Sequence, residues 1–189
     1  MKKELKRQFL HFFLGCTAIL SLFFFGMPEF IAGNIIMLIA GFLVSDAIKK
    51  GKKIPAANGI IKKFLDYAGR DSEKEMPGKG ALTFFAGTLI ASLLFYQNKL
   101  IVIGAIIPLV FGDSFSTVFG KFAGKTKIKD KTLEGSIAGI TISFIYLSVI
   151  FPLPAAFTAA AAGMAMEYLP IEDNYTIPIA AGTALMLLI

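Results

Sequence analysis

An aspartate interrupts the apolar run LVFGDSFSTVFG, where a charged side chain is most in need of an explanation. In a helix, Asp113, Thr117 and Lys121 recur every four residues and share one face, with Ser116 beside them. A carboxylate with hydroxyl neighbours and a lysine suits a phosphate that carries Mg²⁺. The alternative is that Asp113 serves packing alone, neutralised by Lys121 or by another helix.

A lysine-rich connection, GKFAGKTKIKDKTLEGS, follows this aspartate and ends in a second acid, Glu134. Such a charge run is commonly a solvated loop. Here it joins the Asp113 helix to the Glu134 helix, so lysines and carboxylates must meet at one end of the two helices. Two acids could hold magnesium while the lysines neutralise phosphates. The segment is not a P-loop, because only three residues separate Gly120 from Gly124 and an apolar helix precedes it instead of a strand.

A third polar cluster lies in MEYLPIEDNYTIP, between the last two apolar runs. Asp173 and Asn174 form a turn, and we expect Thr176 to cap the helix that follows. His11, the one histidine, lies one to two turns inside the first apolar run. Asp173, Glu167 and His11 are all candidates for a general base, and the sequence does not choose among them.

Composition places these clusters in a membrane protein. Hydrophobic residues make up 56% of the 189 residues and charged residues 17%, which excludes disorder and an ordinary water-soluble domain. The net charge of +6 suits a membrane surface or phosphates, and the apolar content argues against nucleic acid as the partner. The length fits a single domain, residues 1–189.

Seven nearly uncharged runs predict an all-α, polytopic bundle of about seven transmembrane helices. They are residues 9–26, 30–48, 81–96, 100–119, 135–151, 154–168 and 176–189. With the N-terminus in the cytoplasm, every basic residue except Lys99 falls in a cytoplasmic segment, which is the distribution the positive-inside rule requires. The long connection 51–80 contains NGIIKKFLDYAG, whose spacing suits a helix lying in the interface or on the bundle surface. Small residues four apart, Gly87 and Ala91 or Gly135 and Gly139, predict close helix packing.

Four segments resemble the family of membrane lipid kinases that includes dolichol kinase, phytol kinase and CTP-dependent diacylglycerol kinase, the polyprenol kinase family. They are ELKRQFLHFFLG, PGKGALTFFAGTLI, LVFGDSFSTVFGKFAGKTKIKDKTLEGSIAG and EDNYTIPIAAG, and together they cover nearly the whole chain in order. The third is the most specific. The resemblance implies an enzyme that uses CTP and a divalent cation such as Mg²⁺ to phosphorylate the hydroxyl of a lipid alcohol, a polyprenol or dolichol-type isoprenoid, at the cytoplasmic face.

Motif by motif, the resemblance and the spacing together give three sets of candidate residues. The catalytic candidates are Asp113, Asp173, Glu134 and His11. The candidate metal ligands are Asp113, Glu134 and Asp173. The candidates for binding the nucleotide and its phosphates are Lys121, Lys125, Lys131, Gly112, Gly135, Asn174, Ser116 and Thr117.

Several alternatives stay open at this point. A cytidylyltransferase that forms CDP-lipids also places acids beside lysines, and would release pyrophosphate instead of CDP. An ion-coupled transporter could use Asp113, Glu134 and His11 as an ion path, although these acids gather at one face and do not spread across the midplane. The choice of diacylglycerol or another alcohol, of CTP over ATP, and the oligomeric state do not follow from the residues.

Overall fold

The computed structural model describes residues 2–51 and 76–189, and the segment NGIIKKFLDYAG lies outside these ranges. The described chain is almost entirely helical, which confirms the all-α prediction. A two-stranded antiparallel hairpin between α6 and α7 is the exception, and the sequence analysis did not foresee it. In chain order the elements are α1 (Lys2–Phe24), α2 (Met27–Lys49), α4 (Lys79–Leu94), α5 (Lys99–Ile107), the π-helix η2 (Pro108–Gly112), α6 (Asp113–Ala123), β1 (Lys127–Ile128), β2 (Lys131–Thr132), α7 (Leu133–Ser148), α8 (Leu153–Ala165), the 3₁₀-helix η3 (Met166–Tyr168) and α9 (Asp173–Leu188).

Each of the seven apolar runs forms a helix, with α5, η2 and α6 joined as one continuous rod. Local capping sets several of the boundaries: Asn98 accepts hydrogen bonds from the first amides of α5, and Thr132 accepts one from Gly135 at the start of α7. The expected cap at Thr176 is wrong, because α9 already begins at Asp173 and Thr176 lies within it. Pro178 is then inside α9, where it offers no amide to the carbonyl of Asn174.

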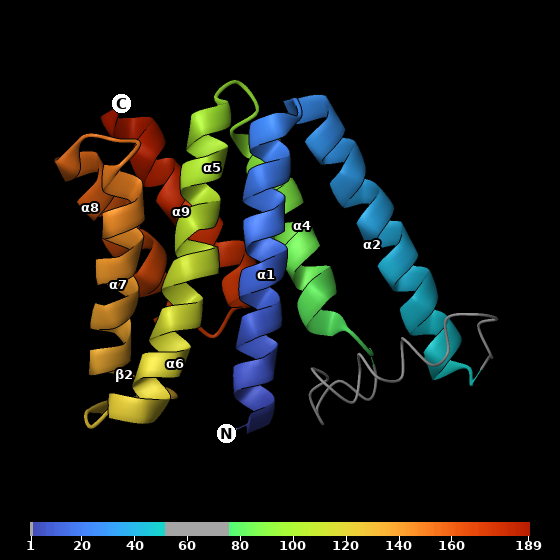
Figure 1. Cartoon of the computed structure of the whole chain (residues 1–189), viewed down its shortest axis with the longest axis horizontal. Coiled ribbons are helices and arrows are strands. Elements are labelled where there is room, and N and C mark those ends of the chain that lie inside the picture. Colours follow the sequence, from blue (N-terminus) through green and yellow to red (C-terminus); the bar gives the residue numbers. More distant parts are fainter. Residues whose placement is uncertain (1, 52–75) are drawn as a thin grey trace.

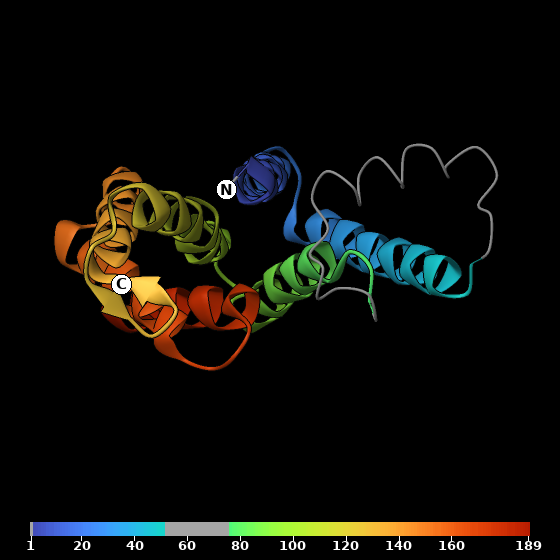
Figure 2. The same ribbon diagram turned by 90° about the horizontal axis from the view of Figure 1, so that it is seen from below.

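The helices run up and down, so their connections collect at two ends of the bundle (Figure 1). The N-terminus and the hairpin lie at one end, which Figure 2 shows from below, and the C-terminus lies at the other (Figure 1). The start of α9 is set back from the hairpin end into the bundle (Figure 1). The three polar clusters of the sequence therefore lie toward the same end, which is called the polar end below.

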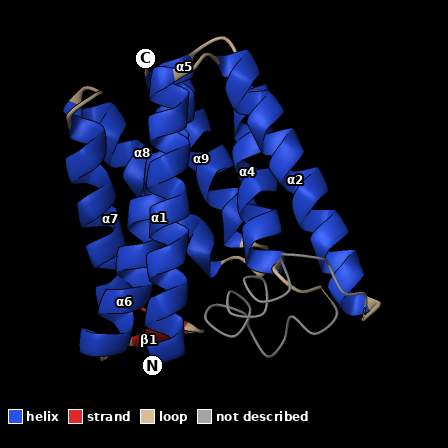
Figure 3. Ribbon diagram, turned by 45° about the vertical axis from the view of Figure 1, so that its right-hand side comes forward, coloured by secondary structure: helices blue, strands red, loops and turns tan. Residues whose placement is uncertain are grey.

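The helices differ in how deeply they are buried. Every residue of α5 from Ile101 to Ile107 is buried, and α5 packs against α9 at the centre of the bundle. By contrast α2 stands at the edge and packs mainly on α4 (Figure 3). Its outer face leaves Ile36, Phe42 and Leu43 more than half exposed. Three helical segments are long and apolar enough to cross a membrane: Glu4–Phe24, Met27–Lys49 and Lys99–Ala123.

Small residues bring helices together where the sequence analysis expected it. A Cβ at Gly87 would collide with the carbonyl oxygen of Asn174, the group that Pro178 leaves without an amide partner, so glycine lets α4 approach α9 closely. A Cβ at Gly135 would lie 2.6 Å from the carbonyl oxygen of Ser116. The packing of α7 on α6, which positions Asp113, therefore depends on glycine at this contact.

Candidate functional site

A cavity of about 600 Å³ opens at the polar end, between α1, the start of α4, α6, the hairpin and the start of α9. Most of its wall is polar, and Leu10, Leu14, Ala81 and Phe84 supply an apolar part of it. The polar residues that line it are Glu4, Arg7, Gln8, His11, Asp113, Ser116, Thr117, Lys121, Lys127, Asp130, Lys131, Thr132, Glu172, Asp173 and Asn174.

Asp113 lies at the inner wall, where the π-helix η2 passes into α6. Its carboxylate is 3.5 Å from Nζ of Lys131 and 4.0 Å from Nε2 of His11. The expected helical stripe exists, since Asp113, Thr117 and Lys121 all line the cavity along α6. A π-turn is uncommon within a helix and is frequent at functional sites, which is consistent with the position of Asp113.

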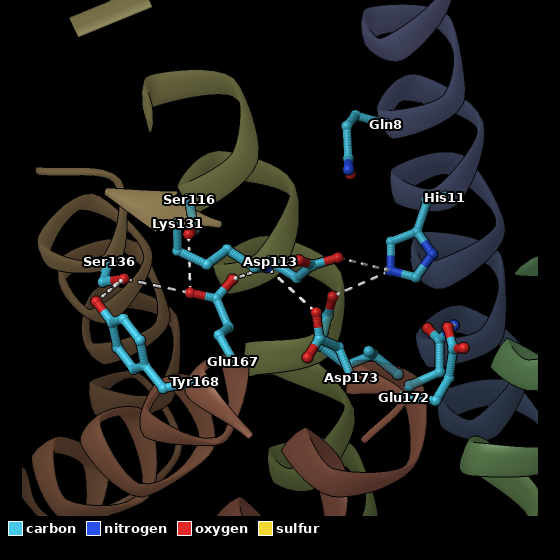
Figure 4. A network of polar contacts seen from close by, with 12 residues as sticks. Gln8, His11, Asp113, Ser116, Lys131, Ser136, Glu167, Tyr168, Glu172 and Asp173 are labelled. Atoms are coloured by element: carbon cyan, nitrogen blue, oxygen red, sulfur yellow. Dashed lines mark hydrogen bonds and ion pairs between the residues drawn. The ribbon is translucent and has the colours of Figure 1, made fainter. Parts of the chain in front are cut away.

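The side chain of Lys131 lies at the centre of the polar network in Figure 4. Besides Asp113, its ammonium group contacts Glu167 at 3.0 Å and Asp173 at 3.2 Å. These carboxylates come from α6, η3 and α9, so one lysine of the hairpin ties three separate elements together. The arrangement balances negative charge that none of these elements could hold near the apolar core alone.

The network shifts the pKa values of Lys131 and Asp173, the two members that lie outside the apolar runs. Burial by itself would lower the pKa of Lys131, but the carboxylates of Asp113, Glu167 and Asp173 more than offset this and raise that pKa above its usual value. Burial raises the pKa of Asp173, Lys131 opposes this and Asp113 adds to it, so the net pKa lies above that of a free aspartate. Lys131 therefore stays charged throughout the physiological pH range.

Glu167 is the residue that the sequence sets left out, although it was considered as a base. It is buried, and its second oxygen accepts hydrogen bonds from Ser116 at 2.9 Å and Ser136 at 3.4 Å. Tyr168 shares a further hydrogen bond with Ser136. The signal in the sequence was an acid near the end of the apolar run 154–168, where a solvated residue is equally common.

Eight of the sequence-predicted residues line the cavity together: Asp113, Asp173, His11, Lys121, Lys131, Asn174, Ser116 and Thr117. Nε2 of His11 is 3.1 Å from the carbonyl oxygen of Leu109, so this nitrogen carries the hydrogen. The amide nitrogen of Asn174 donates to Thr83 at 2.7 Å, which fixes the side chain at the junction of α9 and α4.

The other four predicted residues lie outside the cavity lining. The carboxylate of Glu134 accepts hydrogen bonds from the backbone amides of Lys125 and Thr126, so it holds the start of the hairpin connection. Gly112 and Gly135 lie at helix contacts: a Cβ at Gly112 would meet Ser143 at 2.5 Å, and one at Gly135 would meet α6. The phosphate-binding and metal roles expected for these four residues stay predictions, since none of the four lines the cavity.

The first turns of α1 form the opposite wall, to which the sequence analysis gave no part beyond His11. Glu4 pairs with Arg7 on its own helix, and its other carboxylate oxygen is 3.2 Å from Nζ of Lys121. This contact ties α1 to α6 across the mouth of the cavity. Gln8 lies one turn farther in, and its amide nitrogen donates to Glu4 at 3.3 Å.

The capacity for a metal ion depends on two carboxylates. Within residues 2–51 and 76–189, no group of three or more His, Cys, Asp or Glu side chains is arranged to hold a metal. Asp113 and Asp173 both line the cavity and both contact Lys131. This donor set fits Mg²⁺, which proteins commonly bind through one or two carboxylates with phosphate and water completing the shell.

Comparison with known proteins adds one relative. The chain is 28% identical to uncharacterized protein MJ1137 of Methanocaldococcus jannaschii over 181 residues, which cover 93% of this chain and 89% of that protein. No family model matches the chain. No solved structure matches it either.

Proposed function

We propose that this protein is a multi-pass membrane kinase that transfers the γ-phosphate of CTP to the hydroxyl of a lipid alcohol. The observation that carries the proposal is the cavity at the polar end, where carboxylates, lysines and an apolar inner wall face one space. A phosphorylated nucleotide and a lipid hydroxyl need these three kinds of surface at once. The resemblance to the polyprenol kinase family supplies the choice of CTP and of an isoprenoid alcohol.

Helix length, charge distribution and exposed apolar surface support the proposed membrane arrangement. Three long apolar helices and the exposed faces of α1 and α2 support a bilayer environment. In the proposed topology all seven helices cross the membrane and the polar end faces the cytoplasm, as the distribution of lysine and arginine favours. The nucleotide then reaches the cavity mouth from the cytoplasm.

The triphosphate is proposed to bind between α6 and the hairpin. Lys121, Lys127 and Lys131 line this part of the cavity and supply positive charge to the phosphate oxygens. Asp113 would hold Mg²⁺, which would offset charge on the phosphates, and Asp173 would stay off the metal to act on the lipid hydroxyl. Glu134 is left out of this metal site because both its oxygens are engaged by backbone amides.

The lipid is proposed to approach along the apolar inner wall. Leu14 of α1 and Phe84 of α4 both line this wall, and a hydrocarbon chain along it would bring its hydroxyl toward Asp113. Of the three candidate bases, Glu167 is fully engaged and Nε2 of His11 is a donor, so Asp173 is the carboxylate in the best place to take the proton. The hydroxyl oxygen then bonds to the γ-phosphorus, the bond from that phosphorus to the β–γ bridging oxygen breaks, and CDP leaves.

The nucleotide product separates this proposal from its rivals. Purified protein in lipid nanodiscs is incubated with CTP, Mg²⁺ and a lipid alcohol, and the released nucleotide is identified by chromatography. The kinase releases CDP. Release of pyrophosphate would instead identify a cytidylyltransferase, and solute uptake into vesicles without nucleotide turnover would identify a transporter.

A further inference from the structure

The backbone amide of Asp113 marks an irregular turn in the rod formed by α5, η2 and α6. In an α-helix this amide would donate to the carbonyl of Leu109, four residues earlier. It donates instead to the carbonyl of Pro108, five residues earlier, which is the hydrogen bond of a π-turn. The carbonyl oxygen of Leu109 therefore loses the amide partner that a regular helix would give it.

His11 on α1 supplies a donor to this carbonyl. Nε2 of His11 is 3.1 Å from the carbonyl oxygen of Leu109, and 4.0 Å from the carboxylate of Asp113. Only the shorter distance is that of a hydrogen bond, so the ring hydrogen goes to the carbonyl and not to the carboxylate. Figure 4 shows the ring extending from α1 toward Asp113.

Other contacts of α1 hold it closely against the same turn. A Cβ at Gly15, one helical turn after His11, would collide with the side chain of Val110. The rings of Phe12 and Phe111 meet edge to face, with their centroids 5.3 Å apart. Together with the hydrogen bond from His11, these contacts place α1 against three consecutive residues of η2. The position of the donor is therefore set by packing on both sides.

The π-turn decides the direction in which Asp113 points. Each residue of an α-helix turns the chain by about 100°, so one added residue rotates all that follows by about that angle relative to α5. A regular α-helix through this stretch would turn the carboxylate away from its present direction. Leu109 is fully buried, so a carbonyl left without a donor there costs free energy, and His11 offsets this cost.

We propose that His11 is a positioning residue that stabilises the π-turn and thereby directs Asp113 into the cavity. The inference rests on the proposed function for the phosphoryl transfer that Asp113 serves. In this role the imidazole keeps its hydrogen on Nε2 and takes no proton from the lipid hydroxyl. The role needs a hydrogen-bond donor at this place and does not need a group that titrates.

Two substitutions of His11 separate the donor from the base and from the ring. His11→Gln keeps an amide nitrogen at the same number of bonds from Cβ as Nε2, but the amide is no base. His11→Phe keeps a ring against Phe84, whose ring centroid is 5.2 Å from that of His11, and removes the donor. The base role predicts that both substitutions fail, and a packing role predicts that His11→Phe succeeds. The positioning role predicts that only His11→Phe fails.

Hydrogen exchange of peptides that contain residues 108–113 tests the inference without nucleotide or lipid. Detergent-solubilised wild type and variants are compared by mass spectrometry. Loss of one uncharged hydrogen bond predicts exchange about threefold to tenfold faster in His11→Phe, and His11→Gln should stay within about twofold of wild type. Thr17→Val is the matched control on α1, because its hydroxyl donates to the exposed carbonyl of Phe13, and it should leave this exchange unchanged.

Phosphoryl transfer gives the second readout. In His11→Phe, kcat should fall by at least about tenfold, because Asp113 is misdirected, with KM for the alcohol nearly unchanged. His11→Gln should keep kcat within about twofold of wild type and the same pH profile. His11→Leu repeats both measurements if His11→Phe does not fold.

Unchanged exchange in the variants without a donor would overturn the inference, as would faster exchange in His11→Gln equal to that in His11→Phe. Loss of transfer in His11→Gln with normal exchange would also overturn it, and would assign His11 to proton transfer. If wild type transfers no phosphate, the proposed function fails, and the exchange comparison still decides whether His11 holds the turn.

Discussion

The ammonium group of Lys131 lies 3.0 Å from Oε1 of Glu167, although 36 positions separate the two residues in the chain. The side chain of Glu167 is fully buried, and that of Lys131 is 22% exposed. The same ammonium group also holds Asp113 and Asp173, so removing it would leave several carboxylates together in a largely apolar setting. The pair of Lys131 and Glu167 therefore contributes both to the stability of the bundle and to the position of the side chains in the cavity.

Lys131→Met is expected to lower stability by about 3 kcal/mol, since breaking a buried ion pair leaves an uncompensated charge. Thermal unfolding in detergent measures the loss. Lys129→Met is the control in the same hairpin, because Lys129 is exposed and, among the described residues, donates only to the backbone carbonyl of Tyr168. Its cost should stay below about 1 kcal/mol. Equal losses in the two variants would contradict the central role of Lys131.

Adding Glu167→Gln to Lys131→Met should recover part of the lost stability, because the neutral amide no longer needs the cation. The double-mutant cycle isolates this coupling. If the stability losses of the two single variants simply add in the double variant, the contact between Lys131 and Glu167 carries no interaction energy.

Asp113→Asn is expected to abolish phosphoryl transfer while the protein stays folded. The amide keeps the shape of the side chain and removes the negative charge that the metal requires. Transfer of label to lipid and thermal unfolding are measured on the same preparation. Asp46→Asn on α2 is the control, since Asp46 pairs with the exposed Lys50 at the surface and should leave transfer unchanged. Near-normal activity of Asp113→Asn would refute the metal role.

Lys121 and Lys125, which lie four residues apart in the same lysine-rich stretch, should differ in their contribution to CTP binding. Lys121 lines the cavity and Lys125 does not. Lys121→Met should raise KM for CTP by about tenfold, in line with the loss of one charge-assisted contact to phosphate, and Lys125→Met by less than about twofold. Initial rates at varied CTP measure both. The opposite order would place the triphosphate on the other side of the hairpin.

Gly135→Ala is expected to destabilise the protein by about 2 kcal/mol, because a Cβ there lies 2.6 Å from a backbone oxygen of α6. Gly33→Ala on α2 meets no atom within 4 Å and should be neutral or slightly stabilising. Thermal unfolding compares the two. If Gly135→Ala kept full stability and lost only CTP binding, the glycine would serve phosphate and not packing.

The sequence predicted most of the fold and the inner part of the site, for physical reasons that differ between residues. The long uncharged runs predicted helices, because a helix satisfies its own backbone hydrogen bonds in an apolar setting. The four-residue spacing of Asp113, Thr117 and Lys121 placed these residues on one helix face. Glu134 was predicted at the phosphate site from its proximity to the lysine loop, which does not show that backbone amides engage its carboxylate. Glu167 contacts Ser116 and Lys131, which are distant in the chain, and periodicity does not encode such contacts.

The most direct test follows the terminal phosphate. Wild-type protein in nanodiscs that contain geranylgeraniol, a longer polyprenol or diacylglycerol is given γ-labelled CTP and Mg²⁺, with γ-labelled ATP in parallel. The account predicts label in a lipid phosphate of an isoprenoid alcohol with CTP as donor, no label after chelation of the metal, and none with Asp113→Asn. Label that stays entirely in the nucleotide and free phosphate, whichever alcohol is supplied, would contradict it.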